Sequence, residues 1–265
     1  MTVCIAGLAE HNTIVAVSDM MVSGYLGAAD SGTIKCEDVH QHWQAMMAAD
    51  DLTQCMPIIE KARAFFEGRA NTLQVARSVF KRAYQAHLRE MAEDQVLGRF
   101  GIDMATFLES GRHRFGESLF ASLSNEIRAV ATGTEFLIFG HSDDGEAHLF
   151  IVADPGIDSV YDKPGFCAIG AGAHAANGLL FYLGQSRSRT MPESLFNVCA
   201  AKFMAEKIPG VGQQTFLFVQ PFGTSVCRHN SNLVRDLRKL WEKSGEPRVP
   251  DGAMSVIERA KIVTY

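Results

Sequence analysis

The chain has 265 residues, 47% of them hydrophobic and 21% charged, and its formal net charge at pH 7 is -5. These values are typical of a globular protein with one large domain or two small ones, and the negative net charge argues against a nucleic-acid partner. No apolar run approaches the roughly 20 residues that cross a bilayer, and the first residues lack the charged region and cleavage site of a signal peptide. We therefore expect a cytoplasmic protein without a membrane partner.

The cysteines favour the same compartment. The chain has 6 of them, no two form a C-x-x-C pair, and they mostly lie in apolar strand-like or helix-like stretches. Thiols in such positions are usually buried and reduced, as in cytoplasmic proteins. The cysteines are Cys4, Cys36, Cys55, Cys167, Cys199 and Cys227.

A β-hairpin is predicted directly behind Met1. Residues 2–8 and 13–19 are rich in apolar and β-branched side chains, as strands are, and the turn between them contains Asn12, which tolerates left-handed backbone geometry. A glycine-rich loop follows, and residues 33–48 are predicted to form a second, shorter strand pair.

Two helices are expected next. Residues 52–69 are apolar at intervals of three and four, with Asp50 and Asp51 at the start to cap free N–H groups and Gly68 at the end. Residues 72–94 have a similar pattern, and Asn71 is expected to be the N-cap of that helix.

The segment 95–131 is an addition with a helical pattern. Within it, Leu119, Phe120, Leu123 and Ile127 form an apolar stripe at helical spacing. Such a stripe usually packs inside its own chain, and the alternative is a contact between subunits.

The second half of the chain repeats the order of strands and then helices. Hairpin-connected strands imply antiparallel sheets, and helices in pairs suggest outer layers, so we predict an α+β fold, a four-layer αββα sandwich. Residues 1–228 would form the domain, with a helical insertion at about 95–131, and 229–265 a C-terminal extension with one helix. The predicted elements are strands at 135–141, 147–155, 166–172 and 214–222, and helices at 173–185 and 192–207.

The first strand begins with a candidate nucleophile, Thr2. If an aminopeptidase removes Met1, the free α-amine, with a reference pKa of about 7.7–8, could take the proton of the threonine hydroxyl. Lys35 is the candidate cation that would favour the alkoxide, and Asp19, at the end of the second strand, is the candidate carboxylate that would hold the lysine. Each residue alone has an ordinary structural interpretation, but their combined spacing favours a site.

This spacing resembles that of the N-terminal nucleophile hydrolases, specifically the proteasome β-subunit family. "VAVSDMMVSG", "GTIKCEDV" and "MAADD" look like the family's aspartate, lysine and first-helix segments, and "LIFGHSDDGEAHLFIVADPG" and "GFCAIGAGAHAANGLL" resemble its central hairpin and the following turn. The resemblance covers residues 2 to about 224. "MTVCIA", "LGRFGID" and the final extension are closer to bacterial proteasome-like relatives, among them the subgroup called Anbu.

The resemblance implies the following roles. The backbone N–H of Ala49 would stabilise an oxyanion, while Met47, Val22 and Thr33 would form walls of the substrate pocket, although core packing is an equal interpretation of Met47 and Val22. The backbone of Ser23 would pair with an extended substrate. The resemblance further implies a homo-oligomer that acts on a peptide or amide substrate and needs no cofactor or metal.

The chain departs from the family pattern around this site. Ala171 stands where the family has a serine, Ile208 and Val211 replace an aspartate and a serine, and Met21 replaces a common arginine. Loss of such supporting groups can cost much activity. Two functions therefore stay open: a threonine-type amide-bond hydrolase, and a catalytically silent homologue that acts as a scaffold or binding protein.

Two further patterns have ordinary interpretations. His40 and His42 could be a metal pair, but no third ligand is evident, and an exposed polar face is favoured. The cationic stretch near the C-terminus is interpreted as a solvated helix face. It comprises Arg235, Arg238, Lys239 and Lys243.

Overall fold

The computed structural model describes residues 2–24, 27–30, 32–49, 51–223, 227–229 and 231–245. Met1, whose removal would free the α-amine of Thr2, and the end of the C-terminal extension, 246–265, lie outside the described residues.

The first sheet contains the N-terminal hairpin. Its strand order is β10-β1-β2-β11-β12, and every neighbouring pair is antiparallel. His11 and Asn12, in the turn between the first two strands, have φ values of 56° and 52°, so the predicted left-handed turn is confirmed. The strands are β1 (Cys4–Ala9), β2 (Thr13–Asp19), β10 (Phe166–Ile169), β11 (Thr215–Gln220) and β12 (Cys227–His229).

The second sheet is also antiparallel, with the order β5-β6-β7-β8-β9. Strand β9 was not predicted, because its four residues are mostly exposed and carry no apolar alternation. The strands are β5 (Cys36–His40), β6 (Trp43–Ala49), β7 (Thr134–His141), β8 (Ala147–Ala153) and β9 (Ile157–Val160).

The glycine-rich loop after β2 is more ordered than the sequence suggests. It forms the antiparallel strands β3 (Met21–Gly24) and β4 (Gly27–Asp30). Glycine is depleted in strands in general, which is why this hairpin was interpreted as a loop.

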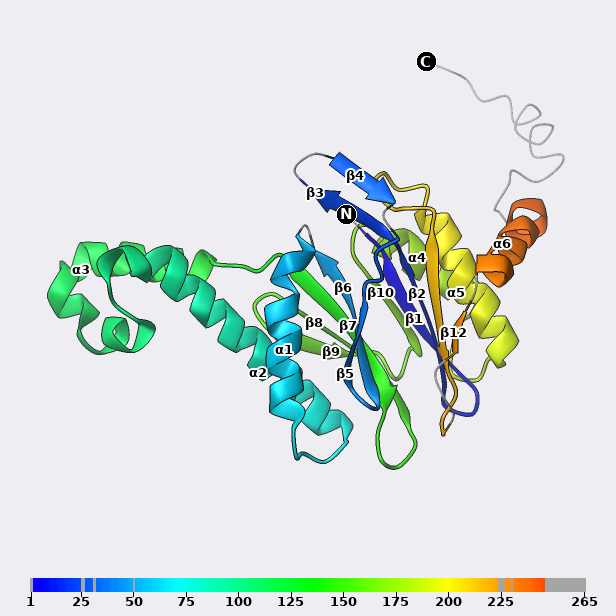
Figure 1. Cartoon of the computed structure of the whole chain (residues 1–265), viewed down its shortest axis with the longest axis horizontal. Helices are drawn as coiled ribbons and strands as arrows, with labels where there is room; N and C mark the ends of the chain where they lie inside the picture. Colours follow the sequence, from blue (N-terminus) through cyan, green and yellow to red (C-terminus); the bar gives the residue numbers. More distant parts are fainter. Residues whose placement is uncertain are drawn as a thin grey trace, which may run out of the picture.

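Apolar clusters join the sheets to helices and to one another (Figure 1). One cluster links the first sheet to α4 (Ala173–Tyr182) and α5 (Met191–Ala205). Another links the second sheet to α1 (Met56–Phe66) and α2 (Leu73–Ala92), and a third lies between the two sheets, where Phe139 contacts Phe218 at a ring-centroid distance of 5.1 Å. The molecule is thus a mixed α+β structure with two facing antiparallel sheets.

The start of α2 corrects one prediction. Thr72, not Asn71, is the N-cap, and its side chain accepts a hydrogen bond from the N–H of Val75. The Asn71 side chain instead accepts a hydrogen bond from Trp43 Nε1 at 2.5 Å and donates one to the carbonyl oxygen of His141 at 3.0 Å. Its amide therefore joins β6 and β7 to the start of the helix, a tertiary role that local sequence does not reveal.

The additional segment contains α3 (Met104–Ala129), which extends away from the two sheets as an arm (Figure 1). Non-helical backbone at Gly116 interrupts this helix. Of the predicted apolar stripe, Leu123 is buried within a small cluster of the arm, whereas Leu119 is 40% exposed. Among the described helices, none is long and apolar enough to span a membrane.

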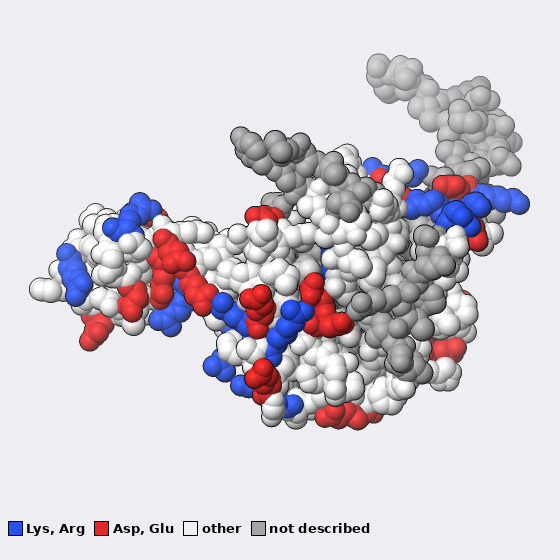
Figure 2. Space-filling model, viewed as in Figure 1, with Lys and Arg blue, Asp and Glu red and all other residues white. Residues whose placement is uncertain are grey.

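The C-terminal helix α6 (Ser231–Leu240) packs on α5 through Val234, which belongs to the first cluster. Figure 2 shows blue side chains gathered over this helix. The predicted solvated face is wrong for Arg238, which is half-buried against Glu206. The proposed division of the chain at residue 228 stays a prediction.

Candidate active site

The two sheets and their connections bring the predicted nucleophile, carboxylate and cation together. Thr2 precedes β1, and Asp19 ends β2, the strand that pairs antiparallel with β1. The N–H of Asp19 donates to the carbonyl oxygen of Val3 at 3.1 Å, so the hairpin itself places the carboxylate beside the first residues. Lys35 lies just before β5, and its carbonyl oxygen accepts the N–H of Met47 at 3.0 Å.

The three side chains form one hydrogen-bonded group. The Thr2 hydroxyl donates to Asp19 Oδ1, and Lys35 Nζ donates to the same hydroxyl oxygen and, at 2.8 Å, to Asp19 Oδ1. None of the three residues is more than 3% exposed. A hydroxyl placed between a cation and a carboxylate is polarised in the way that a nucleophile needs.

Asp19 is held as an anion. Burial alone would raise the pKa of this carboxyl group, but hydrogen bonds from Lys35 and Thr2 outweigh burial and leave the pKa below its usual value. Backbone N–H groups of Val3 (3.0 Å), Met21 (3.3 Å) and Gly212 (3.1 Å) also donate to its oxygens. The carboxylate therefore gives Lys35 an anionic partner and aims its side chain at the hydroxyl.

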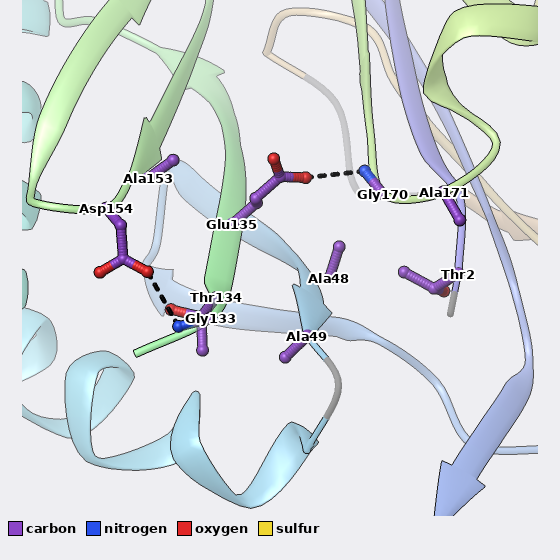
Figure 3. Close-up of a pocket in the computed structure, with 10 residues that line it drawn as sticks. All are labelled: Thr2, Ala48, Ala49, Gly133, Thr134, Glu135, Ala153, Asp154, Gly170 and Ala171. Atoms are coloured by element: carbon purple, nitrogen blue, oxygen red, sulfur yellow. Dashed lines mark hydrogen bonds between the residues drawn. The ribbon is translucent and has the colours of Figure 1, made fainter. Parts of the chain in front are cut away.

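A cavity of about 450 Å³ opens beside Thr2 (Figure 3). Two carboxylates belong to its lining. Glu135, on β7, accepts the N–H of Gly170 at 2.8 Å, and Asp154, directly after β8, accepts the N–H of Gly133 at 2.8 Å. The other lining residues are small, and this leaves room for a substrate. The lining comprises Thr2, Ala48, Ala49, Gly133, Thr134, Glu135, Ala153, Asp154, Gly170 and Ala171.

Gly170 is required by the position of Thr2. Its φ is +85°, and a Cβ atom added to it would lie 2.5 Å from the carbonyl oxygen of Thr2. Two residues later, the N–H of Gly172 donates to that same oxygen at 3.3 Å. The turn after β10 therefore fixes the main chain of the candidate nucleophile.

The other predicted pocket residues lie in different surroundings. Met47 is 4% exposed and packs in the cluster with α1 and α2, whereas Ala49 lines the cavity. Val22 is half-buried on β3, and Thr33 is exposed. Ser23 pairs with Ala28 across β3 and β4. Roles in substrate binding stay predictions for all of them.

The cavity contains residues that the sequence did not reveal. Glu135 and Asp154 lie near the ends of neighbouring strands, and Glu135 pairs in register with Ala153. No motif marks either of them, and the contact of Glu135 with Gly170 depends on how one sheet faces the other. The only sequence pattern that marked this part of the cavity was the "GAG" turn at residues 170–172.

The apolar supporting positions lie at the cavity and in the first cluster. Ala171 lines the cavity, Val211 is buried, and Ile208 packs against the first cluster. The loop that carries Ile208 and Val211 contacts Asp19 through a main-chain N–H, that of Gly212, rather than through an acidic or hydroxyl side chain.

A buried thiol lies next to this group. Cys4 is 0% exposed, and its Sγ is 3.5 Å from the carbonyl oxygen of Met47. Burial raises the pKa of the Cys4 thiol well above its usual value, despite the nearby charge of Lys35.

Metal ligands do not gather in the described part of the chain. No group of three or more His, Cys, Asp or Glu side chains there could hold a metal ion. The rings of His40 and His42 have centroids 5.9 Å apart, and His40 stacks on Phe66 at 5.1 Å.

The fold of two facing antiparallel sheets with helices packed on them is shared with solved structures, at low sequence identity. In a search of solved structures, 538 chains match. One of them is the Anbu (Gly-1) mutant from Hyphomicrobium sp. strain MC1, with 15% sequence identity, a TM-score of 0.62, and coverage of 100% of this chain and 99% of that chain. No family model and no curated protein matches the sequence.

Proposed function

We propose that this protein is an N-terminal threonine amide-bond hydrolase, acting on peptides after removal of Met1. The observation that carries the proposal is the buried contact of Thr2, Asp19 and Lys35 beside a cavity. With it we propose the four-layer αββα arrangement of N-terminal nucleophile hydrolases, formed by residues 1–228.

The reaction would begin at the Thr2 hydroxyl. Its oxygen attacks the substrate carbonyl carbon while the free α-amine of Thr2 takes the hydroxyl proton. Lys35 stabilises negative charge on the attacking oxygen, and Asp19 holds Lys35 in place. The carbonyl oxygen becomes an oxyanion, which the N–H of Ala49 would stabilise.

The second half of the reaction releases both products. As the tetrahedral intermediate collapses, the C–N bond breaks, and the leaving amine takes the proton from the α-ammonium group. Water then attacks the Thr2 ester, with the α-amine again as the base, and the carboxylic acid leaves as the hydroxyl is restored.

Substrate binding would use the cavity and the neighbouring hairpin. Within the described residues β3 pairs only with β4, so its other edge, which includes the backbone of Ser23, could add a substrate strand. Met47, Val22 and Thr33 are proposed as walls that contact the bound side chain.

The alternative is a catalytically silent scaffold. It is favoured by the apolar supporting positions Ala171, Ile208 and Val211.

In either case we propose a homo-oligomer, because Phe181 and Tyr182 at the end of α4 are 80% and 81% exposed. Light scattering at micromolar concentration tests this, and a strict 29.0 kDa monomer at every salt concentration would contradict it.

The deciding experiment combines intact mass with labelling by an acylating electrophile. We expect wild-type protein to lack Met1 and to gain one acyl group on Thr2, and we expect Thr2→Ala to gain none. Thr13→Ala is the matched control, because Thr13 is a buried threonine at the opposite end of the same hairpin. Retained Met1 together with equal labelling of all three proteins would favour the scaffold.

A further inference from the structure

A buried lysine supports the loop that contacts Asp19. Lys202, on α5, is 0% exposed, and its Nζ donates to the carbonyl oxygens of Gly212 and Gln213, each at 2.8 Å. It also donates to the carboxylate of Glu206, one turn further along the chain. A buried ammonium group is costly unless it is paired, so its partners here define its role.

An arginine from α6 completes this arrangement. Arg238 donates to both oxygens of Glu206, at 2.5 and 2.7 Å, and to the carbonyl oxygen of Gln213 at 2.9 Å. Its guanidinium group lies 4.4 Å from the centre of the Phe203 ring. We call Lys202, Glu206 and Arg238 the carbonyl clamp.

The clamp and the active site meet at one glycine. The carbonyl oxygen of Gly212 is bound by Lys202, while the N–H of Gly212 donates to Asp19 Oδ2 at 3.1 Å. Glycine restricts its own backbone less than any other residue. The direction of this N–H therefore depends on the contacts that hold the neighbouring peptide groups. The clamp holds the carbonyl groups of Gly212 and Gln213.

We propose that Lys202, Glu206 and Arg238 are positioning residues, which fix the loop so that the Gly212 N–H supports the Asp19 carboxylate. The clamp would thus replace the acidic and hydroxyl side chains that Ile208 and Val211 cannot supply. The effect on turnover rests on the proposed function, whereas the effect on Asp19 does not. Burial lowers the pKa of Lys202 to about 8, although the adjacent Glu206 carboxylate raises it.

The test is Arg238→Met with Arg235→Met as the control. Arg235 lies on the same helix, its side chain is 59% exposed, and it contacts the adjacent Asp236 at 3.4 Å. The Asp19 carboxyl group and the Gly212 amide are followed by NMR as pH is varied. In Arg238→Met we expect the pKa of Asp19 to rise, because a carboxylate that loses a hydrogen bond is less stable as an anion.

Further readouts separate positioning from folding. In Arg238→Met the NMR signal of the Gly212 amide proton should move upfield. If the wild-type protein is active, the variant's kcat should fall by about tenfold while its KM stays within about twofold. A tenfold fall in kcat corresponds to a loss of about 1.4 kcal/mol of transition-state stabilisation. Arg235→Met should match wild type in every measurement.

A second variant covers the case in which Arg238→Met does not fold. Arg238→Lys keeps the charge but lacks the fork that binds two carboxylate oxygens, so it should show a smaller change in the same direction. If the folded variants keep the wild-type pKa of Asp19 and the wild-type Gly212 amide shift, the proposal is overturned. If the wild-type protein does not turn over peptides, the NMR results still decide the role of the clamp.

Discussion

Replacing Gly170 by alanine would push a methyl group into the main chain of Thr2. The added Cβ would lie 2.5 Å from the Thr2 carbonyl oxygen and 3.0 Å from both its carbonyl carbon and its Cγ2. Such short contacts to backbone can be relieved only by moving Thr2 or the turn. Because a misplacement of about 1 Å can reduce a rate about 100-fold, we expect acylation of Thr2 to slow by one to two orders of magnitude, roughly.

The stability effect has two parts that can be separated. A side chain at positive φ costs about 1–2 kcal/mol, and the collision with Thr2 adds to this, as overpacking typically adds about 1–3 kcal/mol. Gly101 is the matched control: its φ is +65°, and an added Cβ would meet nothing within 4 Å. Gly101→Ala should therefore lose only the first part.

The assay is denaturant unfolding of both variants together with the acylation rate of Thr2. We expect Gly170→Ala to be less stable than Gly101→Ala by about 1–3 kcal/mol and to be the only one that acylates slowly. Equal losses of stability with unchanged acylation would refute the reasoning, because they would show that the turn does not determine where Thr2 lies.

Three other changes probe the same group and the core. Lys35→Ala should reduce turnover by at least about 100-fold, measured with a peptide substrate, and near wild-type turnover would exclude the lysine from the mechanism. Asp19→Asn should destabilise the protein by about 3–5 kcal/mol at pH 7, because it leaves Lys35 buried without its counter-charge. The pKa of Asp19 is lowered in the folded protein, so the ionised carboxylate stabilises the fold fully above the ordinary aspartate pKa, and this stabilisation is lost as pH falls through the native pKa. The difference in unfolding free energy between wild type and Asp19→Asn should therefore narrow below about pH 4. A difference that stays constant from about pH 7 to about pH 2 would contradict this. Phe150, on β8, is 0% exposed and packs in the cluster with α1 and α2. Phe150→Ala should lower the free energy of unfolding in urea by about 3–5 kcal/mol. A loss under about 1 kcal/mol would show that the surrounding side chains fill the cavity.

The hydrogen-bonded trio was predictable because local geometry determines most of it. A short turn at His11 and Asn12 forces residue 19 back to the start of β1, so the spacing of Thr2 and Asp19 has a direct structural meaning. The cavity lining was not predictable in the same way. Glu135 reaches Gly170 only because the two sheets face each other, and a single sequence holds no local signal of that packing.

The same distinction explains the errors in the secondary structure. Asn71 and Thr72 are both good N-caps by residue type, and only the tertiary contacts of Asn71 with Trp43 and His141 decide between them. The hairpin of β3 and β4 was missed because its glycines hide its strand character. The carbonyl clamp was missed because Arg238 looked like one of several surface cations.

The burial of Cys4 protects this thiol from oxidants. A thiol is oxidised or alkylated mainly as the thiolate, and only when a reagent can reach it. Cys4 is inaccessible, and the raised pKa of its thiol keeps it protonated, although it lies close to the proposed nucleophile. A reagent such as iodoacetamide or hydrogen peroxide should therefore leave Cys4 unmodified, and the proposed nucleophile is itself an oxygen rather than a sulfur.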